Sequence, residues 1–156
     1  MLYNENLHEE EQHLIQQIAE QTERGKICLL YTSSMIDRYL DRGRMYVLED
    51  NGVKCECVVT DEGNGILEIK NIATEPAFQG KGYAKMLISF IAREYSGRFE
   101  VLQVGTGNSP LTIPFYEKCG FVRSHIIPNF FTDNYNHPIF ECGIQLVDMV
   151  FLQKSI

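Results

Sequence analysis

The chain has 156 residues, 44% of them hydrophobic and 22% charged, as expected for one soluble domain with a sizeable core. A formal net charge of −7, without any dense run of lysine and arginine, argues against nucleic acid as a partner. The sequence contains neither an apolar run long enough to cross a bilayer nor a basic leader, so we expect no membrane partner and a cytoplasmic location.

The five cysteines are odd in number and lack paired C-x-x-C spacing, which predicts reduced thiols and argues against a disulfide framework or a structural zinc site. Cys55 and Cys57 fall on one face of a predicted strand, where we interpret them as small buried side chains. We therefore predict no metal site.

The first elements in chain order are predicted to be a helix, a strand and a short helix. Leucine and isoleucine recur at helical spacing between Leu7 and Ile18, and Gly25 is a plausible stop. Residues 26–31 then have the pattern of a buried strand. Ser34 can cap a short helix that ends at Gly43.

The next segment is predicted to form three consecutive strands. Asn51-Gly52 is a strong hairpin signal between strand-like runs at 44–50 and 53–60. A further turn at 61–65 leads into an apolar strand at 66–74.

The remaining elements alternate between helices and strands. An apolar stripe predicts a helix that begins near Gly80 and ends around Gly97, a strand follows at 99–104, and a second helix occupies about 111–119. Pro114 removes a backbone donor inside this helix, so a start near Ile113 is the alternative. Strands at 121–126 and 141–153, separated by a loop at 127–138, complete a mixed α/β sheet flanked by helices.

A glycine-rich turn, Gln79-Gly80-Lys81-Gly82-Tyr83-Ala84, joins the strand at 66–74 to the helix that follows. The first amides of a helix have no intrahelical acceptor, and glycines let a phosphate approach the main chain, so this turn predicts a pyrophosphate site. It is not a Walker A loop, because Gly82 follows Lys81, nor a dinucleotide fingerprint, because Lys85 occupies the place of the third small residue.

The turn spells Q-x-x-G-x-A, and with two flanking segments, Asn71–Pro76 and Phe115–Phe121, it resembles the GNAT acyltransferase superfamily. This resemblance covers roughly residues 44–126 and implies a single domain over 1–156. It implies a mostly antiparallel twisted sheet whose central strands splay apart. It also implies acetyl-CoA as co-substrate, with the pyrophosphate at Gln79, Gly80, Lys81, Gly82, Tyr83 and Ala84.

The resemblance also implies roles for other residues around the acyl donor. The pantetheine arm would pair with the main chain of Ile72, Ala73 and Thr74. Tyr116 would donate a proton to the departing thiolate, although an aromatic packed under the sheet is the structural alternative. An asparagine that binds pantetheine in many members has two candidates here, Asn108 and Ser109; the run from Gly105 to Asn108 could instead be a flexible turn.

The general base stays open between several groups. Glu68 lies 11 residues before Gln79, where several family members carry a catalytic glutamate. By alternation it shares a strand face with Lys70 and Ile72, so it could equally be a solvated residue paired with Lys70. Glu75, His137 and a water chain are the other candidates. An acceptor amine must be kept neutral to attack a thioester, so one of them is needed.

Acceptor selectivity is expected in the loop before the last strand. Its residues Phe130, Phe131, Tyr135 and His137 could form a pocket wall, and Glu141 and Asp148 in the strand that follows could hold the acceptor ammonium. The same aromatics could instead anchor a long loop to the core or form a dimer surface.

We therefore predict an N-acetyltransferase that moves the acetyl group of acetyl-CoA to a primary amine of a small molecule by direct attack in a ternary complex. Two alternatives stay open: a non-catalytic sensor or interaction module that binds acyl-CoA, and a protein N-terminal acetyltransferase. The family also suggests a homodimer built through the final strands.

Overall fold

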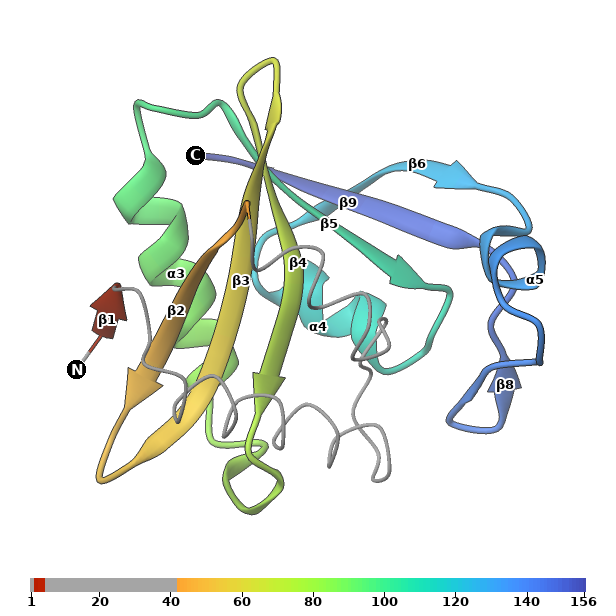
Figure 1. Cartoon of the computed structure of the whole chain (residues 1–156), viewed down its shortest axis with the longest axis horizontal. Helices are drawn as coiled ribbons and strands as arrows, with labels where there is room; N and C mark the ends of the chain where they lie inside the picture. The colour runs from red at the N-terminus through yellow and green to blue at the C-terminus, as the bar shows by residue number, and fades with distance from the viewer. Residues whose placement is uncertain (1, 5–41) are drawn as a thin grey trace.

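The computed structural model describes residues 2–4 and 42–156, in which a sheet of seven strands is the main element. Neighbouring strands run antiparallel, except for β4 and β5, which are parallel. The predicted fold class is confirmed: a mixed, mostly antiparallel sheet with helices packed on it (Figure 1). Across the sheet the strands are β1 (Leu2–Asn4), β2 (Arg44–Glu49), β3 (Val53–Gly63), β4 (Ile66–Thr74), β5 (Val101–Gly107), β9 (Met149–Ser155) and β6 (Val122–Ile127).

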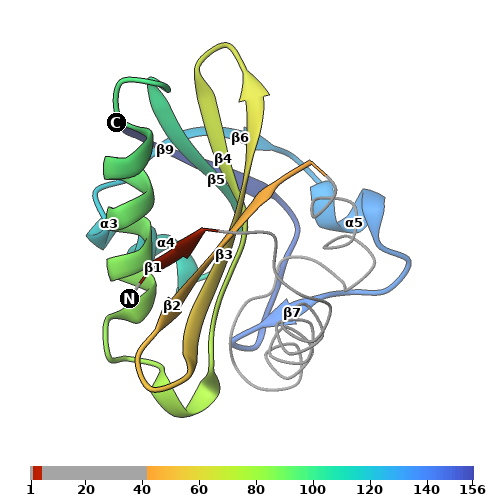
Figure 2. The same ribbon diagram turned by 60° about the vertical axis from the view of Figure 1, so that its left-hand side comes forward.

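Two helices cover one face of this sheet. α3 (Tyr83–Tyr95) packs against β2, β3 and β4, and α4 (Thr112–Lys118) packs against β5; Figure 2 shows both on the same side. The predicted apolar stripe of α3, with Leu87 and Ile91, is fully buried against the inward side chains of the strands, among them Cys55 and Cys57. The interpretation of these cysteines as buried core residues is confirmed.

Positive backbone dihedrals fix the two hairpins that precede the site. Asn51 and Gly52 have φ of 54° and 101°, as a two-residue turn that follows the strand twist requires. β3 then extends to Gly63, three residues beyond the predicted end, so the second turn consists of Asn64 and Gly65, again with positive φ.

β4 and β5 pair over only part of their length. Ile66–Ile69 pairs with Val101–Val104, after which β4 stays with β3 while β5 continues along β9 (Figure 1). The two strands therefore separate toward their carboxyl ends, as the family resemblance implies.

β5 is longer than the sequence pattern predicts. Gly105 and Gly107, interpreted as part of a turn or a ligand contact, are buried strand residues paired with β9. A Cβ at Gly105 would lie 3.0 Å from the ring of Phe151, and one at Gly107 would lie 2.8 Å from Leu146. Glycine is needed here for close packing, and the flexible-turn interpretation is wrong.

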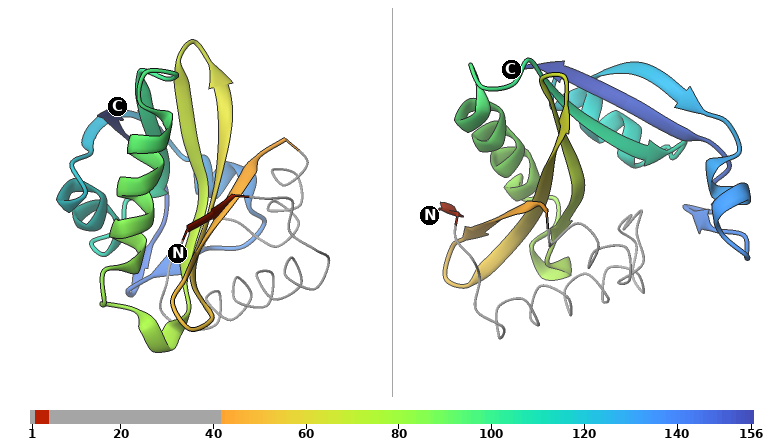
Figure 3. Two further views of the ribbon diagram at one scale, coloured as in Figure 1. Left: turned by 90° about the vertical axis from the view of Figure 1, so that its left-hand side faces the viewer. Right: turned by 45° about the horizontal axis from the view of Figure 1, so that its top comes forward.

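The C-terminal region differs most from prediction. In place of one strand at 141–153, a small hairpin of β7 (Phe140–Glu141) and β8 (Ile144–Gln145) precedes β9. The predicted loop contains a short helix, α5 (Phe130–Asn134), and Figure 3 shows this region at the end of the sheet far from α3. Cys142 and Gly143, both with positive φ, turn the chain within the predicted strand.

The predicted helix at Leu7–Ile18, the strand at 26–31 and the short helix after Ser34 lie outside the described residues. Within 2–4 and 42–156, no helix has the length and apolar character that spanning a membrane requires.

Candidate active site

A cavity of about 500 Å³ lies on the helix-covered side of the sheet, near the end of β4. Its wall comes from β4, the short 3-10 helix η1 (Pro76–Phe78), the first turn of α3 and one side of α4. The structure brings eight predicted site residues to this one cavity: Ile72, Thr74, Gln79, Gly80, Gly82, Tyr83, Ala84 and Tyr116.

The glycine turn gives the cavity a wall of main-chain amides. Gly80 and Gly82 have φ of 74° and 88°, and a Cβ added to either would meet no neighbouring atom within 4 Å. Gly82 is the N-cap of α3, and no side chain caps this end. The helix begins at Tyr83 and not near Gly80, because the left-handed glycines end the turn first. The amides of this first turn are therefore available to an anion.

Two hydrogen bonds hold the turn in place. The hydroxyl of Tyr83 donates to Oδ2 of Asp50 at 2.8 Å, which ties the start of α3 to the β2–β3 hairpin. This bond raises the pKa of Tyr83. Nε2 of Gln79 donates to the carbonyl oxygen of Thr74 at 3.4 Å, linking the turn to β4. The turn is thus braced from both sides.

The charge of the described cavity wall is positive although the chain is acidic. Lys85 and Lys118 line it, and none of its described lining residues carries a carboxylate. Lys81, predicted as a site residue, does not line the cavity itself; its Nζ lies 4.8 Å from the ring centroid of Phe78, which does. Such a wall favours an anionic occupant.

Tyr116 stands in the part of the cavity formed by α4. It is 5% exposed, and its ring makes edge contacts with Phe115 and Phe121 at centroid distances of 5.1 and 5.6 Å. Cys119 also lines the cavity, where burial raises the pKa of its thiol against the opposing effect of Lys85. The thiol is therefore not activated as a nucleophile.

β4 contains a β-bulge, so the residues after it point to the opposite face of the sheet from the one that strict alternation predicts. Ile69 and Asn71 pair with consecutive residues of β3, so Lys70 has no residue opposite. Ile72 consequently packs against the helix-side core. The prediction that Ile72 shares a face with Glu68 and Lys70 is wrong, because strict alternation assumes that no residue is inserted.

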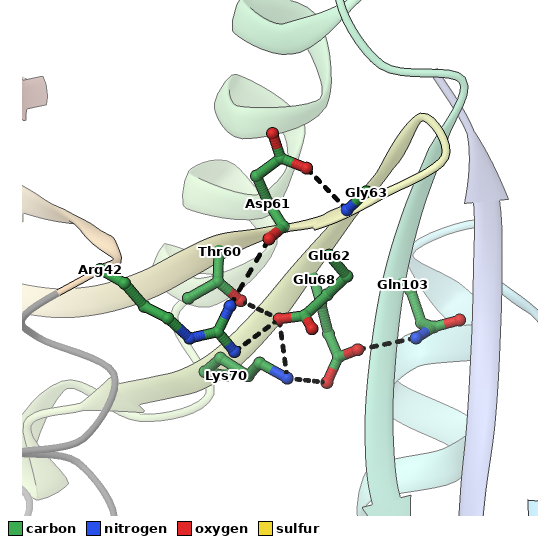
Figure 4. A network of polar contacts seen from close by, with 8 residues as sticks. All are labelled: Arg42, Thr60, Asp61, Glu62, Gly63, Glu68, Lys70 and Gln103. Carbon is green, nitrogen blue, oxygen red and sulfur yellow. Dashed lines mark hydrogen bonds and ion pairs between the residues drawn. The ribbon is translucent and has the colours of Figure 1, made fainter.

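Glu68 is engaged through both carboxylate oxygens (Figure 4). Oε1 accepts a hydrogen bond from Nζ of Lys70 at 2.7 Å, and Oε2 accepts one from Nε2 of Gln103 at 2.7 Å. Oε1 of Gln103 accepts a further bond from Gln153 of β9, also at 2.7 Å. Side chains of β4, β5 and β9 thus form a polar ladder at the point where β4 and β5 part.

Lys70 extends this ladder to a second carboxylate. Its Nζ lies 3.0 Å from Oε1 of Glu62, which also accepts hydrogen bonds from Arg42 and Thr60 (Figure 4). Partial burial acts to raise the pKa of Glu62, but the bonds from Thr60 and Lys70 outweigh it and lower the pKa.

Comparison with known proteins places this geometry in a family. The model of the acetyltransferase (GNAT) domain matches residues 41–123. The chain belongs to the GNAT acetyltransferase family. An uncharacterized N-acetyltransferase of Bacillus subtilis, YvbK, is similar to this GNAT chain, with 35% identity over 131 residues that cover 80% of the chain and 83% of the relative.

Solved structures similar to this chain cover almost its whole length. An IAA acetyltransferase from Bacillus cereus superposes with a TM-score of 0.80 at 28% identity, covering 100% of both chains. A GNAT acetyltransferase from Elizabethkingia anophelis with acetyl-CoA bound gives 0.82 at 27% identity, covering 100% of this chain and 97% of that one. A Bacillus subtilis acetyltransferase in complex with CoA gives 0.81 at 28%, covering 99% and 97%.

These findings confirm both the motif-based family assignment and the enzyme class: the chain is a GNAT N-acetyltransferase that depends on acetyl-CoA. They leave its acceptor unidentified.

In the part of the chain that the structure describes, no three or more His, Cys, Asp or Glu side chains gather as a metal site would require.

Several residues predicted to belong to the GNAT site lie elsewhere. Asn108 is exposed, and Ser109 is buried with its hydroxyl accepting a bond from the amide of Leu111 at 3.1 Å; neither lines the cavity. Ala73 lies on β4 between two lining residues but does not line the cavity either. Glu75 is half-buried just after β4.

The predicted acceptor residues do not line this cavity either. Phe131 is 2% exposed and stacks on Tyr135 at a centroid distance of 5.8 Å, with Phe130 packed against the same small cluster. This packing matches the alternative of a loop anchored by its aromatics. Both carboxylate oxygens of Glu141 are buried without a hydrogen-bond partner in the described part of the chain, and burial raises its pKa to about 7.

The remaining loop candidates are at or near the surface. His137 is exposed beside Asn136, and Oδ1 of Asp148 accepts the backbone amide of Asn129 at 2.9 Å.

Three residues of interest were missed from the sequence. Lys85 and Lys118 line the cavity, and a search for cations near the glycine turn and near Tyr116 would have found both. Glu56, on β3, is completely buried. Its signal was a carboxylate between two cysteines in the apolar middle of the strand, on the opposite face from Cys55 and Cys57.

Proposed function

We propose that this GNAT enzyme transfers the acetyl group of acetyl-CoA to the primary amine of a small molecule by direct attack in a ternary complex. The observation that carries the proposal is the cavity of about 500 Å³ with a glycine turn at one part of its wall and Tyr116 at another. The first-turn amides of α3, with Lys85, would hold the pyrophosphate. The main chain of Ile72 to Thr74 would orient the pantetheine arm.

The relatives support the donor half of this proposal. Two similar solved proteins carry acetyl-CoA or CoA. Acetyl-CoA would bring an activated thioester, so the protein's tasks are to orient the amine, to accept its proton and to protonate the leaving sulfur. Tyr116 is suited to the last task, because it is buried at the cavity wall and its ring is fixed by two aromatic neighbours.

Direct transfer is supported by the state of the thiol at the site. Cys119 is the cysteine that lines the cavity, and burial raises its pKa, whereas a covalent route needs an activated thiolate. A small-molecule amine is the proposed acceptor class.

Calorimetry with acetyl-CoA and CoA tests the donor half of the proposal, and release of the CoA thiol with a panel of primary amines tests the transfer. We expect saturable binding of both ligands and turnover with at least one amine. Absence of binding would overturn the donor site, and binding without turnover would favour a non-catalytic acyl-CoA sensor.

A further inference from the structure

Glu56 lies beside the proposed site on the sheet face opposite the cavity. In the β3–β4 register it is directly opposite Ala73, in the segment proposed to orient pantetheine. Its strand neighbours Cys55 and Cys57 belong to the helix-side core, so by alternation Glu56 projects from the other face. A donor bound in the cavity would occupy the helix side, which leaves this other face for the approach of the acceptor.

The carboxylate of Glu56 is buried and only half satisfied. The residue is 0% exposed; Oε1 accepts a hydrogen bond from Nδ2 of Asn71 at 2.8 Å, and Oε2 has no hydrogen-bond partner among residues 2–4 and 42–156. Burial raises the pKa of Glu56 to about 8. Asn71 comes directly after the bulge at Lys70, which turns its side chain toward Glu56.

No described cation neutralises this carboxylate. Nζ of Lys54 donates to the carbonyl of Asn51 and lies 3.7 Å from the ring centroid of Phe78. Lys70 pairs with Glu62 and Glu68.

The described strands on either side of Glu56 place no charge directly opposite it. Its register partners on β2 and β4 are Val47 and Ala73, both apolar, and the nearby thiols of Cys55 and Cys57 face away. A buried carboxylate without a cation is costly for folding, so its presence beside a reaction site points to a chemical task.

Resting on the proposed transfer, we propose that Glu56 is the proton acceptor for the amine, held in place by Asn71. Glu68 is the weaker candidate, because both of its oxygens already accept hydrogen bonds and protonation would disrupt its ion pair with Lys70. Glu68 is instead a positioning residue that fixes the separation of β4 and β5.

The proton balance is as follows. Oε2 of Glu56 takes one proton from the acceptor ammonium, and the freed lone pair attacks the thioester carbonyl carbon. The C–N bond forms and the C–S bond breaks. Tyr116 protonates the leaving sulfur and regains a proton from the nitrogen, and the proton on Glu56 passes to solvent.

The test follows release of the CoA thiol from acetyl-CoA across pH, with primary amines from propylamine to spermidine and with water as the acceptor-free reference. Wild type should show a kcat that rises with pH through about 8, the pKa of Glu56. We call this rise of kcat with pH the basic limb. Glu56→Gln should lower kcat about 100-fold and lose this limb, while the Kd for acetyl-CoA stays within about twofold. Glu56→Asp, which keeps a carboxylate, should keep the limb at a reduced kcat.

Glu94→Gln, an exposed change on α3, is the charge-matched control and should behave as wild type. Retention of the limb in Glu56→Gln, or its loss in Glu68→Gln alone, would overturn the proposal. If Glu56→Gln does not fold, loss of the limb in Glu56→Asp overturns it. Wild type that fails to bind acetyl-CoA, or that binds it but releases no thiol with any amine, overturns the proposed function itself, whereas wild type that turns over without a rise of kcat through about pH 8 overturns only the role of Glu56.

Discussion

Glu68 of β4 and Gln103 of β5 face each other one residue before the two strands stop pairing, and the Gln103 amide donates a 2.7 Å hydrogen bond to the Glu68 carboxylate. This bond spans the apex of the opening between the strands. It continues through Gln153 into β9, so three strands are joined by side chains just where main-chain pairing of β4 and β5 ends.

Glu68→Gln tests the positioning role. The amide removes the ion pair with Lys70 and misplaces a donor against the Gln103 amide, so the free energy of unfolding should fall by about 1–3 kcal/mol. Urea denaturation measures it. Glu94→Gln, which breaks an exposed 3.4 Å pair with Arg98, should cost less than about 1 kcal/mol. Equal losses in the two variants would remove Glu68 from this role.

Glu56 should make stability depend on pH in an unusual direction. Its pKa is raised from 4.5 to about 8 in the folded protein, so ionisation opposes folding. The penalty is absent below about pH 4.5, grows between about 4.5 and 8, and is complete above.

Glu56→Gln removes that penalty. The free energy of unfolding of Glu56→Gln minus that of wild type should therefore become larger by roughly 2–4 kcal/mol as the pH rises from about 5 to about 9. Denaturant titrations at several pH values measure the difference. A pH-independent difference between the two proteins would mean that Glu56 is ionised normally in the folded state.

The glycine turn can be tested with a matched pair of variants. Gly82 and Gly97 have φ of 88° and 82°, and a Cβ at either position meets nothing within 4 Å. Gly82→Ala and Gly97→Ala should therefore each cost about 1–2 kcal/mol of stability through backbone strain. Only Gly82→Ala should weaken acetyl-CoA binding, by about tenfold, which calorimetry can measure. Equal affinities in both variants would place the pyrophosphate away from this turn.

Tyr116→Phe should lower kcat about 100-fold while the Kd for acetyl-CoA stays nearly constant, because the hydroxyl acts only as the sulfur leaves. Thiol release and calorimetry give the two quantities. Tyr95→Phe is the control: its buried hydroxyl bonds Tyr46 at 2.7 Å, so its loss should affect stability and leave kcat alone. An unchanged kcat in Tyr116→Phe would leave Tyr116 a packing residue.

Phe131→Ala separates the two interpretations of the C-terminal aromatics. If Phe131 anchors the loop, its truncation leaves a hole beside Leu146 and Met149 and costs about 3–5 kcal/mol. Phe140→Ala, at a side chain 63% exposed, should cost under about 1 kcal/mol. Thermal denaturation compares them. A stable Phe131→Ala protein with altered amine preference would favour the acceptor wall.

Local chemistry made much of the fold predictable. The Asn51-Gly52 turn needs positive φ and its residues tolerate it, and the apolar run of β4 has the predicted bounds, 66–74. The glycine turn could be identified as an anion site from the sequence, because glycines at the start of a helix let an anion approach the main-chain amides. Eight of the predicted site residues accordingly meet at one cavity.

The predictions that were wrong or missing share a physical cause. They concern features that depend on strand pairing between distant parts of the chain and not on the local sequence. The bulge at Lys70 is set by the register of β4 with β3, and the local sequence carries no signal that predicts it. The sequence around Gly105 predicts a turn, and only the structure shows that Phe151 packs against this glycine. Glu56 is one of several charged residues of β3, and only its burial without a cation among the described residues points to a role.

The inserted residue at Lys70 has a consequence for how the enzyme can change. Because of it, Ile72 and Thr74 face the helices while Asn71 faces Glu56, so consecutive positions of β4 lie on opposite faces of the sheet. If the same residues paired regularly, without the bulge, the end of the strand would exchange faces: Asn71 would enter the helix-side core and Ile72 would lie on the face of Glu56. The bulge thus sets which positions at the end of β4 can vary toward the cavity and which can vary toward Glu56.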